Sequence, residues 1–344
     1  MKLYQLLATI SIFLFSGAIF GQNPKILFVE KPDLNEVLNE DGINAIMEDK
    51  LGFLWIGGWN GLFRYDGNQT INYTSKYDGM LPKKIFCLYS ASDSLVWIGT
   101  YGQGLFSFNI SNNAIERFDS VGGLKLRNIY TIIEDTDKSI WIGTSENLLH
   151  YKNKKFSVFP LHQITNGKTN LLMITAIVKD KFGSFWIGSN NGVFRFNPAT
   201  GKFLSVVPEI STYVSYMLGH NNKLWICSKS GLYSLIPEKD AYSNGNFFTI
   251  NSRKIPEYIP SISVANFGTD SYWLTSQNNF YLINDKEKTS TPIQFYSGLN
   301  QKLNPLIQTS FENKNSILWL GSQHGVYKVD NKPKKFTSFF NNDA

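Results

Sequence analysis

The chain has 344 residues, of which 42% are hydrophobic and 15% aromatic, so it is long enough to bury a sizeable core. Its formal net charge of +6 is spread along the chain, without the concentrated basic stripe that nucleic-acid binding requires. The presence of only two cysteines excludes a disulfide-rich scaffold. We therefore expect one large globular domain with no nucleic-acid partner.

The first 21 residues are predicted to be a signal peptide. Met1-Lys2 is followed by an apolar stretch from Leu3 to Phe20, and Gly21 supplies a small residue for cleavage. An uncleaved anchor is the alternative, because about 18 apolar residues is near the minimum for spanning a membrane. We expect the mature chain, residues 22–344, to be periplasmic or extracellular, with no stable membrane insertion after cleavage.

Seven of the eight tryptophans recur at intervals of 39 to 48 residues, and each opens a similar short phrase. An interval of about 44 residues is the length of one four-stranded propeller blade, and seven blades make a common closed ring. The sequence therefore predicts an all-β fold, a seven-bladed β-propeller of four-stranded antiparallel blades spanning residues 22–344. The blades are marked by Trp55, Trp97, Trp141, Trp186, Trp225, Trp273 and Trp319.

Each repeat is predicted to contain four strands, A to D. Strand A is an apolar stretch such as Ile43 to Met47, and strand B carries the tryptophan. Strand C carries a large, mostly aromatic residue such as Phe63, and strand D follows, as at Thr70 to Thr74. An Asp-x-x-Gly turn, as at Asp49 and Asp180, joins A to B. Strand B is apolar at consecutive positions, so we expect neighbouring blades to cover both of its faces.

When the seven repeats are aligned on their tryptophans, three columns of the alignment predict the local geometry. The second position after it is small, which indicates crowding where adjacent blades meet. The third position is usually Ser or Thr, whose hydroxyl we expect to satisfy backbone groups near the hairpin. Another column contains only residues that tolerate a positive φ, and it predicts a tight hairpin between strands B and C. Its members are Gly61, Gly104, Asn147, Gly192, Gly231, Asn279 and Gly325.

The sequence leaves open which terminal segment closes the ring. Eight segments resemble strand D, whereas a ring of seven blades needs seven. Either Ile26 to Val29 completes the seventh blade and leaves Lys335 to Phe340 spare, or the roles are reversed. The segment that pairs with strand C at Val326 to Val329 distinguishes the two closures.

The phrase Asp-x-x-Gly-x-x-Trp-Ile-Gly, followed by Gly-(Leu/Val)-Phe-Arg, is clearest in residues 49–65 and 180–196. It resembles the two-component regulator propeller repeat, and the resemblance covers residues 26 to 340, with drift in copies five to seven. Such repeats usually form the extracytoplasmic sensor of bacterial hybrid two-component regulators, and some members sense oligosaccharides. The resemblance implies a separate membrane signalling protein or missing downstream domains as partner, because this sequence contains no kinase or output module.

The tips of the B–C hairpins are the predicted ligand-binding rim. They are expected to lie on one face of the ring, and their chemistry varies while the columns around them do not. Trp59 lies outside the repeating series, and an exposed indole beside amides suits stacking on a sugar ring. Loops on a rigid scaffold commonly carry function, although ordinary turn preferences explain the same residues. The candidates are Trp59, Asn60, Tyr101, Gln103, Glu146, Asn190, Asn191, Lys229, Gln277, Asn278, Gln323 and His324.

The sequence carries no linear catalytic or metal-binding motif, so no catalytic residue, metal or cofactor is predicted. Cys87 and Cys227 fall on distant blades and are expected to be buried small apolar residues rather than a disulfide. The predicted function is a sensing or binding propeller for a small molecule or an oligosaccharide. The alternatives are a secreted lyase or hydrolase with its site at the axial mouth, and a protein–protein docking module.

Overall fold

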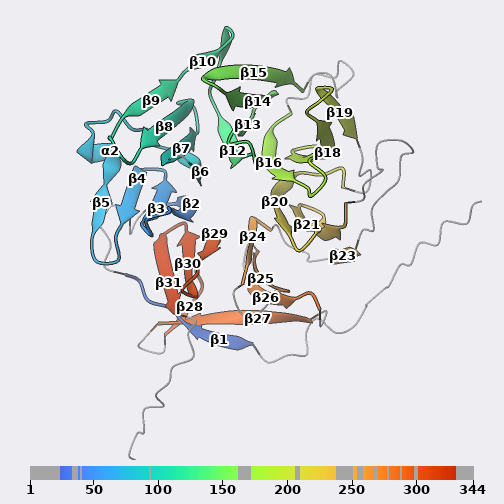
Figure 1. Cartoon of the computed structure of the whole chain (residues 1–344). Helices are drawn as coiled ribbons and strands as arrows, with labels where there is room; N and C mark the ends of the chain where they lie inside the picture. The colour runs from blue at the N-terminus through green and yellow to red at the C-terminus, as the bar shows by residue number, and fades with distance from the viewer. Residues whose placement is uncertain are drawn as a thin grey trace, which may run out of the picture.

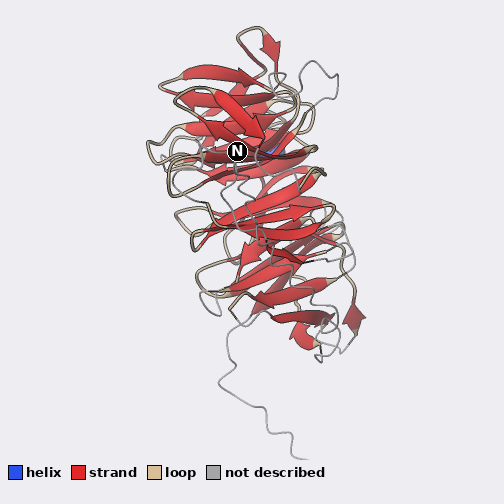
Figure 2. Ribbon diagram, turned by 90° about the vertical axis from the view of Figure 1, so that its right-hand side faces the viewer, coloured by secondary structure: helices blue, strands red, loops and turns tan. Residues whose placement is uncertain are grey.

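In the computed structural model, seven small antiparallel sheets surround a common axis, as the sequence predicts (Figure 1). Seen from the side, the ring is a flattened body with its strands lying across its thickness (Figure 2). The structure describes residues 24–32, 38, 41–92, 94–161, 172–205, 210–237, 251–253, 259–265, 270–276, 279–286, 289–297 and 301–330. The predicted signal peptide, residues 1–21, lies outside these residues. Within them, no helix is long and apolar enough to cross a membrane.

In each blade the strands follow one another from the axis to the rim in chain order. Blade 1 contains β2 (Ile43–Glu48), β3 (Leu54–Gly58), β4 (Gly61–Tyr65) and β5 (Thr70–Asn72), and the short helix α2 (Tyr73–Lys76) follows it. Blade 2 contains β6 (Ile85–Ser90), β7 (Leu95–Thr100), β8 (Leu105–Asn109) and β9 (Ile115–Phe118). A small hairpin, β10 (Ser120–Val121) and β11 (Leu124–Lys125), connects blade 2 to blade 3. Blade 3 contains β12 (Ile129–Glu134), β13 (Ile140–Thr144), β14 (Asn147–Lys152) and β15 (Lys155–Pro160).

The remaining blades follow the same order. Blade 4 contains β16 (Ile174–Lys179), β17 (Phe185–Ser189), β18 (Gly192–Asn197) and β19 (Lys202–Ser205). Blade 5 contains β20 (Val214–His220), β21 (Lys223–Ser228), β22 (Gly231–Leu235) and β23 (Asn251–Arg253). Blade 6 contains β24 (Ser261–Val264), β25 (Ser271–Thr275), β26 (Phe280–Asn284) and β27 (Thr289–Tyr296), with β28 (Lys302–Leu303) paired to β27. Blade 7 contains β29 (Ile307–Glu312), β30 (Ile317–Ser322) and β31 (Gly325–Asp330).

The repeating tryptophans are buried between blades, which explains their period. Trp97 packs edge-on against Tyr151 of the next blade, with ring centroids 5.2 Å apart. Trp319 of blade 7 makes the same contact with Tyr65 of blade 1 at 5.6 Å, and so continues the series across the closure of the ring. Aromatic pairs in this geometry add to the stabilisation that burial of their area provides.

The small residue two positions after the tryptophan is explained by crowding between blades, as predicted. A Cβ atom on Gly143 would lie 2.5 Å from Cγ2 of Ile174, the first residue of the next strand A. The same contact recurs at the closure, where a Cβ on Gly321 would lie 2.7 Å from Cγ2 of Ile43. Distances this short leave no space for a side chain, so the column is small because the inner strands approach closely.

The hydroxyl column also acts as predicted. In six blades the Ser or Thr hydroxyl donates to a backbone carbonyl at the hairpin; the donors are Thr100, Thr144, Ser189, Ser228, Ser276 and Ser322. Left-handed backbone follows at Gly61, Gly104, Gly192, Gly231 and Gly325. The prediction is wrong in blade 3, where the residue with positive φ is Glu146 and not Asn147. There the hairpin turns one residue earlier, and the Glu146 N–H donates to the carbonyl of Leu172, in the loop that leads into blade 4.

The aspartates of the A–B turns do more than form turns. Oδ1 of Asp180 accepts hydrogen bonds from the backbone N–H groups of Phe182 and Ser184, each at 2.9 Å. Its Oδ2 accepts the indole N–H of Trp186 at 2.9 Å and lies 3.5 Å from the Arg195 guanidinium, which is as buried as the carboxylate. Asp49 binds the turn and the indole of blade 1 in the same way. The spacing of six residues from Asp to Trp thus positions the indole.

The N-terminal segment joins blades 6 and 7. The strand β1 (Lys25–Phe28) runs parallel to β27 along all four of its residues, at the blue edge of the ring in Figure 1. Glu30 then pairs with Lys328 of β31 through two backbone hydrogen bonds of 2.9 Å. The closure predicted for Ile26 to Val29 is therefore not observed as such: Lys25 to Phe28 pair with blade 6, and only Glu30 pairs with strand C of blade 7. Lys335 to Phe340 lies outside the described residues.

Candidate functional site

The predicted rim residues lie on the B–C hairpins, but the structure brings only some of them together. Gln277 and Asn278 lie outside the described residues. Trp59 and Tyr101, on the hairpins of blades 1 and 2, contact each other edge-on with ring centroids 6.2 Å apart. Their side chains remain 42% and 47% exposed, respectively, although both are large aromatics. These two side chains therefore form the centre of the candidate site.

The hairpin that carries Trp59 is held by a buried carboxylate. Blade 1 has Gly58 in place of the usual hydroxyl, and Asp41 takes over only the acceptor part of its role, toward the N–H groups of the hairpin. The carboxylate oxygens of Asp41 accept hydrogen bonds from the Trp59 and Asn60 N–H groups at 3.0 and 2.9 Å. Burial raises the pKa of Asp41, and these hydrogen bonds oppose the shift. The indole edge lies against Gly42, where a Cβ would approach Trp59 to 2.8 Å.

Two aromatic residues that the sequence interpretation missed extend the pair. Phe86 lies 6.3 Å from the Trp59 ring and 5.7 Å from the Tyr101 ring. Tyr130 of blade 3 lies 5.4 Å from Phe86. We call these four residues, Trp59, Phe86, Tyr101 and Tyr130, the aromatic patch. It continues across three adjacent blades on one face of the ring.

Phe86 and Tyr130 occupy a special position of strand A. The pairing between strands A and B shifts register at this residue in six blades, which marks a β-bulge. In blades 1 and 4 the bulged residue is polar and donates to the first strand of the next blade. Asn44 donates to the Ile85 carbonyl at 2.9 Å, and Thr175 to the Val214 carbonyl at 2.6 Å. Aromatic residues replace this link in blades 2 and 3.

Polar groups border the aromatic patch. The Tyr130 hydroxyl accepts from the Asn128 amide at 3.3 Å and lies 3.5 Å from the Ser145 hydroxyl. Gln103 accepts the Lys83 N–H at 3.0 Å through its carbonyl oxygen. Aromatic faces beside amides and hydroxyls can bind a ligand that has an apolar face and a polar edge.

The other predicted rim residues mainly shape their own hairpins. Asn190 uses its side-chain oxygen to accept the Met173 N–H at 2.9 Å. The backbone N–H groups of Asn191 and His324 donate to hydroxyls of the serine column. Those of Lys229 and Gln323 donate to carbonyls of the loops that precede strand A. The structure therefore places these residues on the predicted face but outside the aromatic patch.

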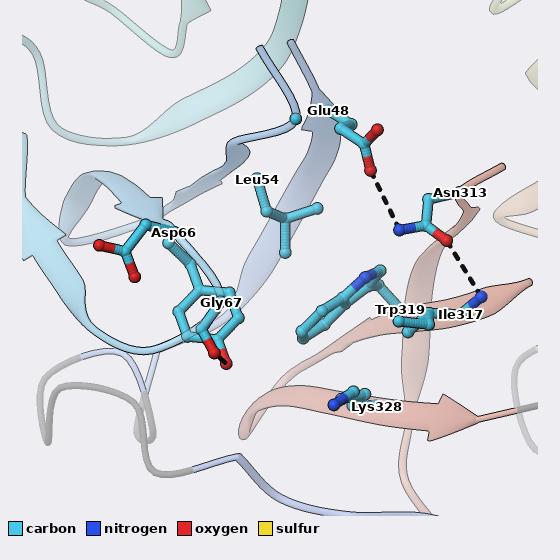
Figure 3. Close-up of a pocket in the computed structure, with 10 residues that line it drawn as sticks. Glu48, Leu54, Asp66, Gly67, Asn313, Ile317, Trp319 and Lys328 are labelled. Atoms are coloured by element: carbon cyan, nitrogen blue, oxygen red, sulfur yellow. Dashed lines mark hydrogen bonds between the residues drawn. The ribbon is translucent and has the colours of Figure 1, made fainter. Parts of the chain in front are cut away.

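A cavity of about 270 Å³ lies on the opposite face, between blades 1 and 7 (Figure 3). Trp319 and Tyr65 line it, and charged groups are contributed by Glu48, Asp66 and Lys328. Glu48 and Lys328 lie on opposite sides of the Trp319 indole in Figure 3. The sequence interpretation did not identify this cavity, because its walls belong to the first and last blades.

His150, His220 and both cysteines are engaged in packing, whereas His324 is exposed on its hairpin. His150 stacks on Trp141 with ring centroids 4.1 Å apart, and burial lowers its pKa. His220 is within hydrogen-bond distance of the Tyr272 hydroxyl at 3.1 Å. Both cysteines are free, as predicted, and burial raises the pKa of Cys87 to about 12. Within the described residues, no three His, Cys, Asp or Glu side chains are grouped to hold a metal ion.

Comparison with known proteins places the repeat in a family. Residues 37–60 and 123–146 match the two-component regulator propeller, so the chain carries repeats of that family. It is 24% identical to Histidine kinase P4 of Formosa agariphila, in a match that covers 63% of this chain and 21% of that protein. The chain therefore spans about a fifth of the length of this curated relative.

Solved structures show the same fold. The extracellular domain of a hybrid two-component system from B. thetaiotaomicron is similar with a TM-score of 0.72 and 17% identity, over 89% of this chain and 42% of that one. A virginiamycin B lyase from Staphylococcus aureus is similar with a TM-score of 0.66 and 14% identity, over 86% of this chain and 97% of that one. The fold is thus shared by an extracellular domain of a two-component system and by a lyase, so the fold alone does not assign a function to this chain.

Proposed function

We propose that this propeller is the ligand-binding part of an extracytoplasmic sensor of the two-component type, and that its ligand binds on the aromatic patch. The patch is the observation that carries the proposal. Trp59 and Tyr101 are held by backbone hydrogen bonds and still expose nearly half of their surface, which packing of the fold does not require. The likeness to an extracellular domain of a hybrid two-component system supports the signalling context.

An oligosaccharide is the ligand class that these groups suit best. The face of a sugar ring carries C–H groups that stack on indole and phenol rings, while its edge carries hydroxyls. Asn128, Ser145 and the amide N–H₂ of Gln103 offer donors and acceptors beside the patch. We propose that the signal passes to a kinase on a separate membrane protein or on a longer form of this chain.

Isothermal titration of the secreted protein against a panel of glycans tests this proposal. We expect one class of oligosaccharide to bind, and we expect Trp59→Ala and Tyr101→Ala each to weaken it about tenfold, equivalent to about 1.4 kcal/mol. Phe182→Ala is the matched control, because Phe182 is 39% exposed and lies on an A–B turn of the opposite face. Mass spectrometry of the recovered ligand distinguishes a sensor, which leaves it unchanged, from a lyase or hydrolase. Equal affinities of the Trp59 and Phe182 variants would refute the placement of the site.

A further inference from the structure

Three cationic residues border the aromatic patch, on the loops that lead into strands A of blades 2 and 3. Lys83 and Lys84 precede β6, and Arg127 precedes β12. All three residues are exposed, and among the described residues none of them forms a salt bridge. The sequence distributes its charge along the chain, and only the fold brings these three positions beside the same hairpins.

Lys84 joins the two hairpins that carry Trp59 and Tyr101. Its N–H donates to the Trp59 carbonyl at 3.1 Å, and its own carbonyl accepts the Tyr101 N–H at 2.9 Å. The backbone of Lys84 has a φ of 54°, in the left-handed region that glycine adopts at lower cost. The turn itself therefore does not require a side chain at this position, and the lysine side chain begins between the two hairpins.

Lys83 and Arg127 are attached to the hairpin of blade 2. The Lys83 N–H donates to the side-chain oxygen of Gln103 at 3.0 Å. The Arg127 carbonyl accepts the N–H groups of Gly102 and Gly104 at 3.0 and 3.1 Å. These bonds fix the backbone and leave the ammonium and guanidinium groups to bind an acidic group of a ligand.

The acidic residues near the patch leave these cations largely uncompensated. Asp41 is 1% exposed, and its carboxylate accepts the N–H groups of the blade 1 hairpin. Asp119 forms an ion pair of 2.7 Å with Arg117, and Asp78 follows α2, which lies at the outer edge of the ring (Figure 1). Glu146 is exposed on the hairpin of blade 3. Three cations therefore adjoin the patch beside one exposed acid.

We propose that the oligosaccharide bound on the aromatic patch is acidic, with carboxylate or sulfate groups that pair with Lys83, Lys84 and Arg127. This inference rests on the function proposed above and specifies its ligand. The C–H faces of the sugar rings stack on Trp59 and Tyr101, while the acidic groups at their edges reach the cations. Charge-assisted hydrogen bonds of this kind favour an acidic sugar over its neutral counterpart.

Titration calorimetry with pairs of oligosaccharides that differ only in charge tests this inference. One pair is an oligogalacturonate and its methyl ester, and the other is a sulfated galactan oligosaccharide and its desulfated form. The two pairs distinguish a carboxylate from a sulfate. We expect the acidic member of at least one pair to bind about tenfold more tightly than its neutral partner. The difference should shrink in about 1 M salt, because screening then acts within about 3 Å.

Charge variants assign the effect to individual residues. Lys84→Gln and Arg127→Gln should each weaken binding of the acidic member about fivefold, and binding of the neutral member less. Lys181→Gln is the matched control and should have no effect, because this exposed lysine lies on an A–B turn of the opposite face. Glu146→Gln should strengthen binding of the acidic member, because it removes a repelling charge beside the patch.

Far-ultraviolet circular dichroism checks that each variant is folded, and three outcomes are decisive. The inference is overturned, while the proposed function stands, if neutral oligosaccharides bind as tightly as acidic ones and lose affinity in Trp59→Ala. It is also overturned if Lys84→Gln, Arg127→Gln and Lys181→Gln bind the acidic member equally well, since the attraction would then come from the net charge of the chain. If no oligosaccharide of either form binds the folded chain, the proposed function and this inference are both refuted.

Discussion

Replacing Asp180 with alanine should destabilise the ring more than any other single change in an A–B turn. The carboxylate satisfies two backbone N–H groups and the indole of Trp186, and it is the acidic partner of Arg195. Both charged side chains are only 1% exposed. Removing the acid leaves a buried guanidinium without its counter-charge, in addition to donors that lose their acceptor.

The expected loss is about 3–5 kcal/mol of unfolding free energy, the usual cost of breaking a buried ion pair by removing one partner. Asp180→Asn should cost less, because Asn313 of blade 7 accepts two turn N–H groups through its amide oxygen at 3.0 Å. Combining Asp180→Ala with Arg195→Leu should recover part of the loss. Leucine is the natural residue at this position in blade 6, where Leu282 faces Trp273.

Urea unfolding followed by circular dichroism measures these changes, and the double variant completes a mutant cycle. We expect a positive coupling between Asp180 and Arg195, with the double variant more stable than the sum of the single losses predicts. It is refuted if Asp180→Ala costs less than about 1 kcal/mol, the scale of an exposed ion pair, or if the two losses are additive.

Three further predictions concern packing and titration. Gly143→Ala should cost about 1–3 kcal/mol in urea unfolding, because the new Cβ would lie 2.5 Å from Ile174 and force the inner strands apart. Burial lowers the pKa of His150, so the unfolded chain takes up that proton first, and the stability that neutral His150 contributes should be lost as pH falls below about 6.5. The His150→Phe variant should lack this part of the pH dependence of the unfolding free energy. The thiols of Cys87 and Cys227 should resist a thiol reagent at pH 8 until urea unfolds the chain, since burial raises both pKa values.

The architecture was predictable because residues of the same kind make the same contacts at equivalent positions of the blades. Six hydroxyls donate at six hairpins, and five glycines adopt left-handed backbone where the repeat places them. The prediction failed at Asn147, where the left-handed residue is instead Glu146, whose N–H donates to the Leu172 carbonyl. This hydrogen bond is made by the loop that leads into blade 4, so the residue column at the hairpin does not reveal the shift.

The candidate site was only partly predictable. Trp59 and Tyr101 were identified because the residues at the hairpin tips vary from blade to blade, whereas the residues around them do not. Phe86 and Tyr130 were missed because they belong to strand A, which resembles a uniform apolar stretch. Their signal was present, since each lies eleven residues before its tryptophan, where blades 1 and 4 have Asn44 and Thr175. Only the β-bulge in the sheet shows that the residue at this position lies outside the regular pairing between strands A and B.

The role of Asp41 and the closure at Glu30 depend on contacts that do not recur in the other blades. Asp41 lies eighteen residues before the Trp59 N–H that it binds, and no other blade uses a carboxylate there. Glu30 pairs with a strand almost three hundred residues away. Both are contacts of single residues, and a repeat pattern contains no information about them.

Hydrogen–deuterium exchange of the chain with and without its bound glycan tests the central claim most directly. Binding on the aromatic patch should slow exchange at the hairpins of residues 59–61 and 101–104 and at the start of β6 and β12. The turns of residues 49–53 and 313–317 on the opposite face should exchange as they do in the free protein. Protection confined to that opposite face, or spread evenly over all seven blades, would contradict the assignment.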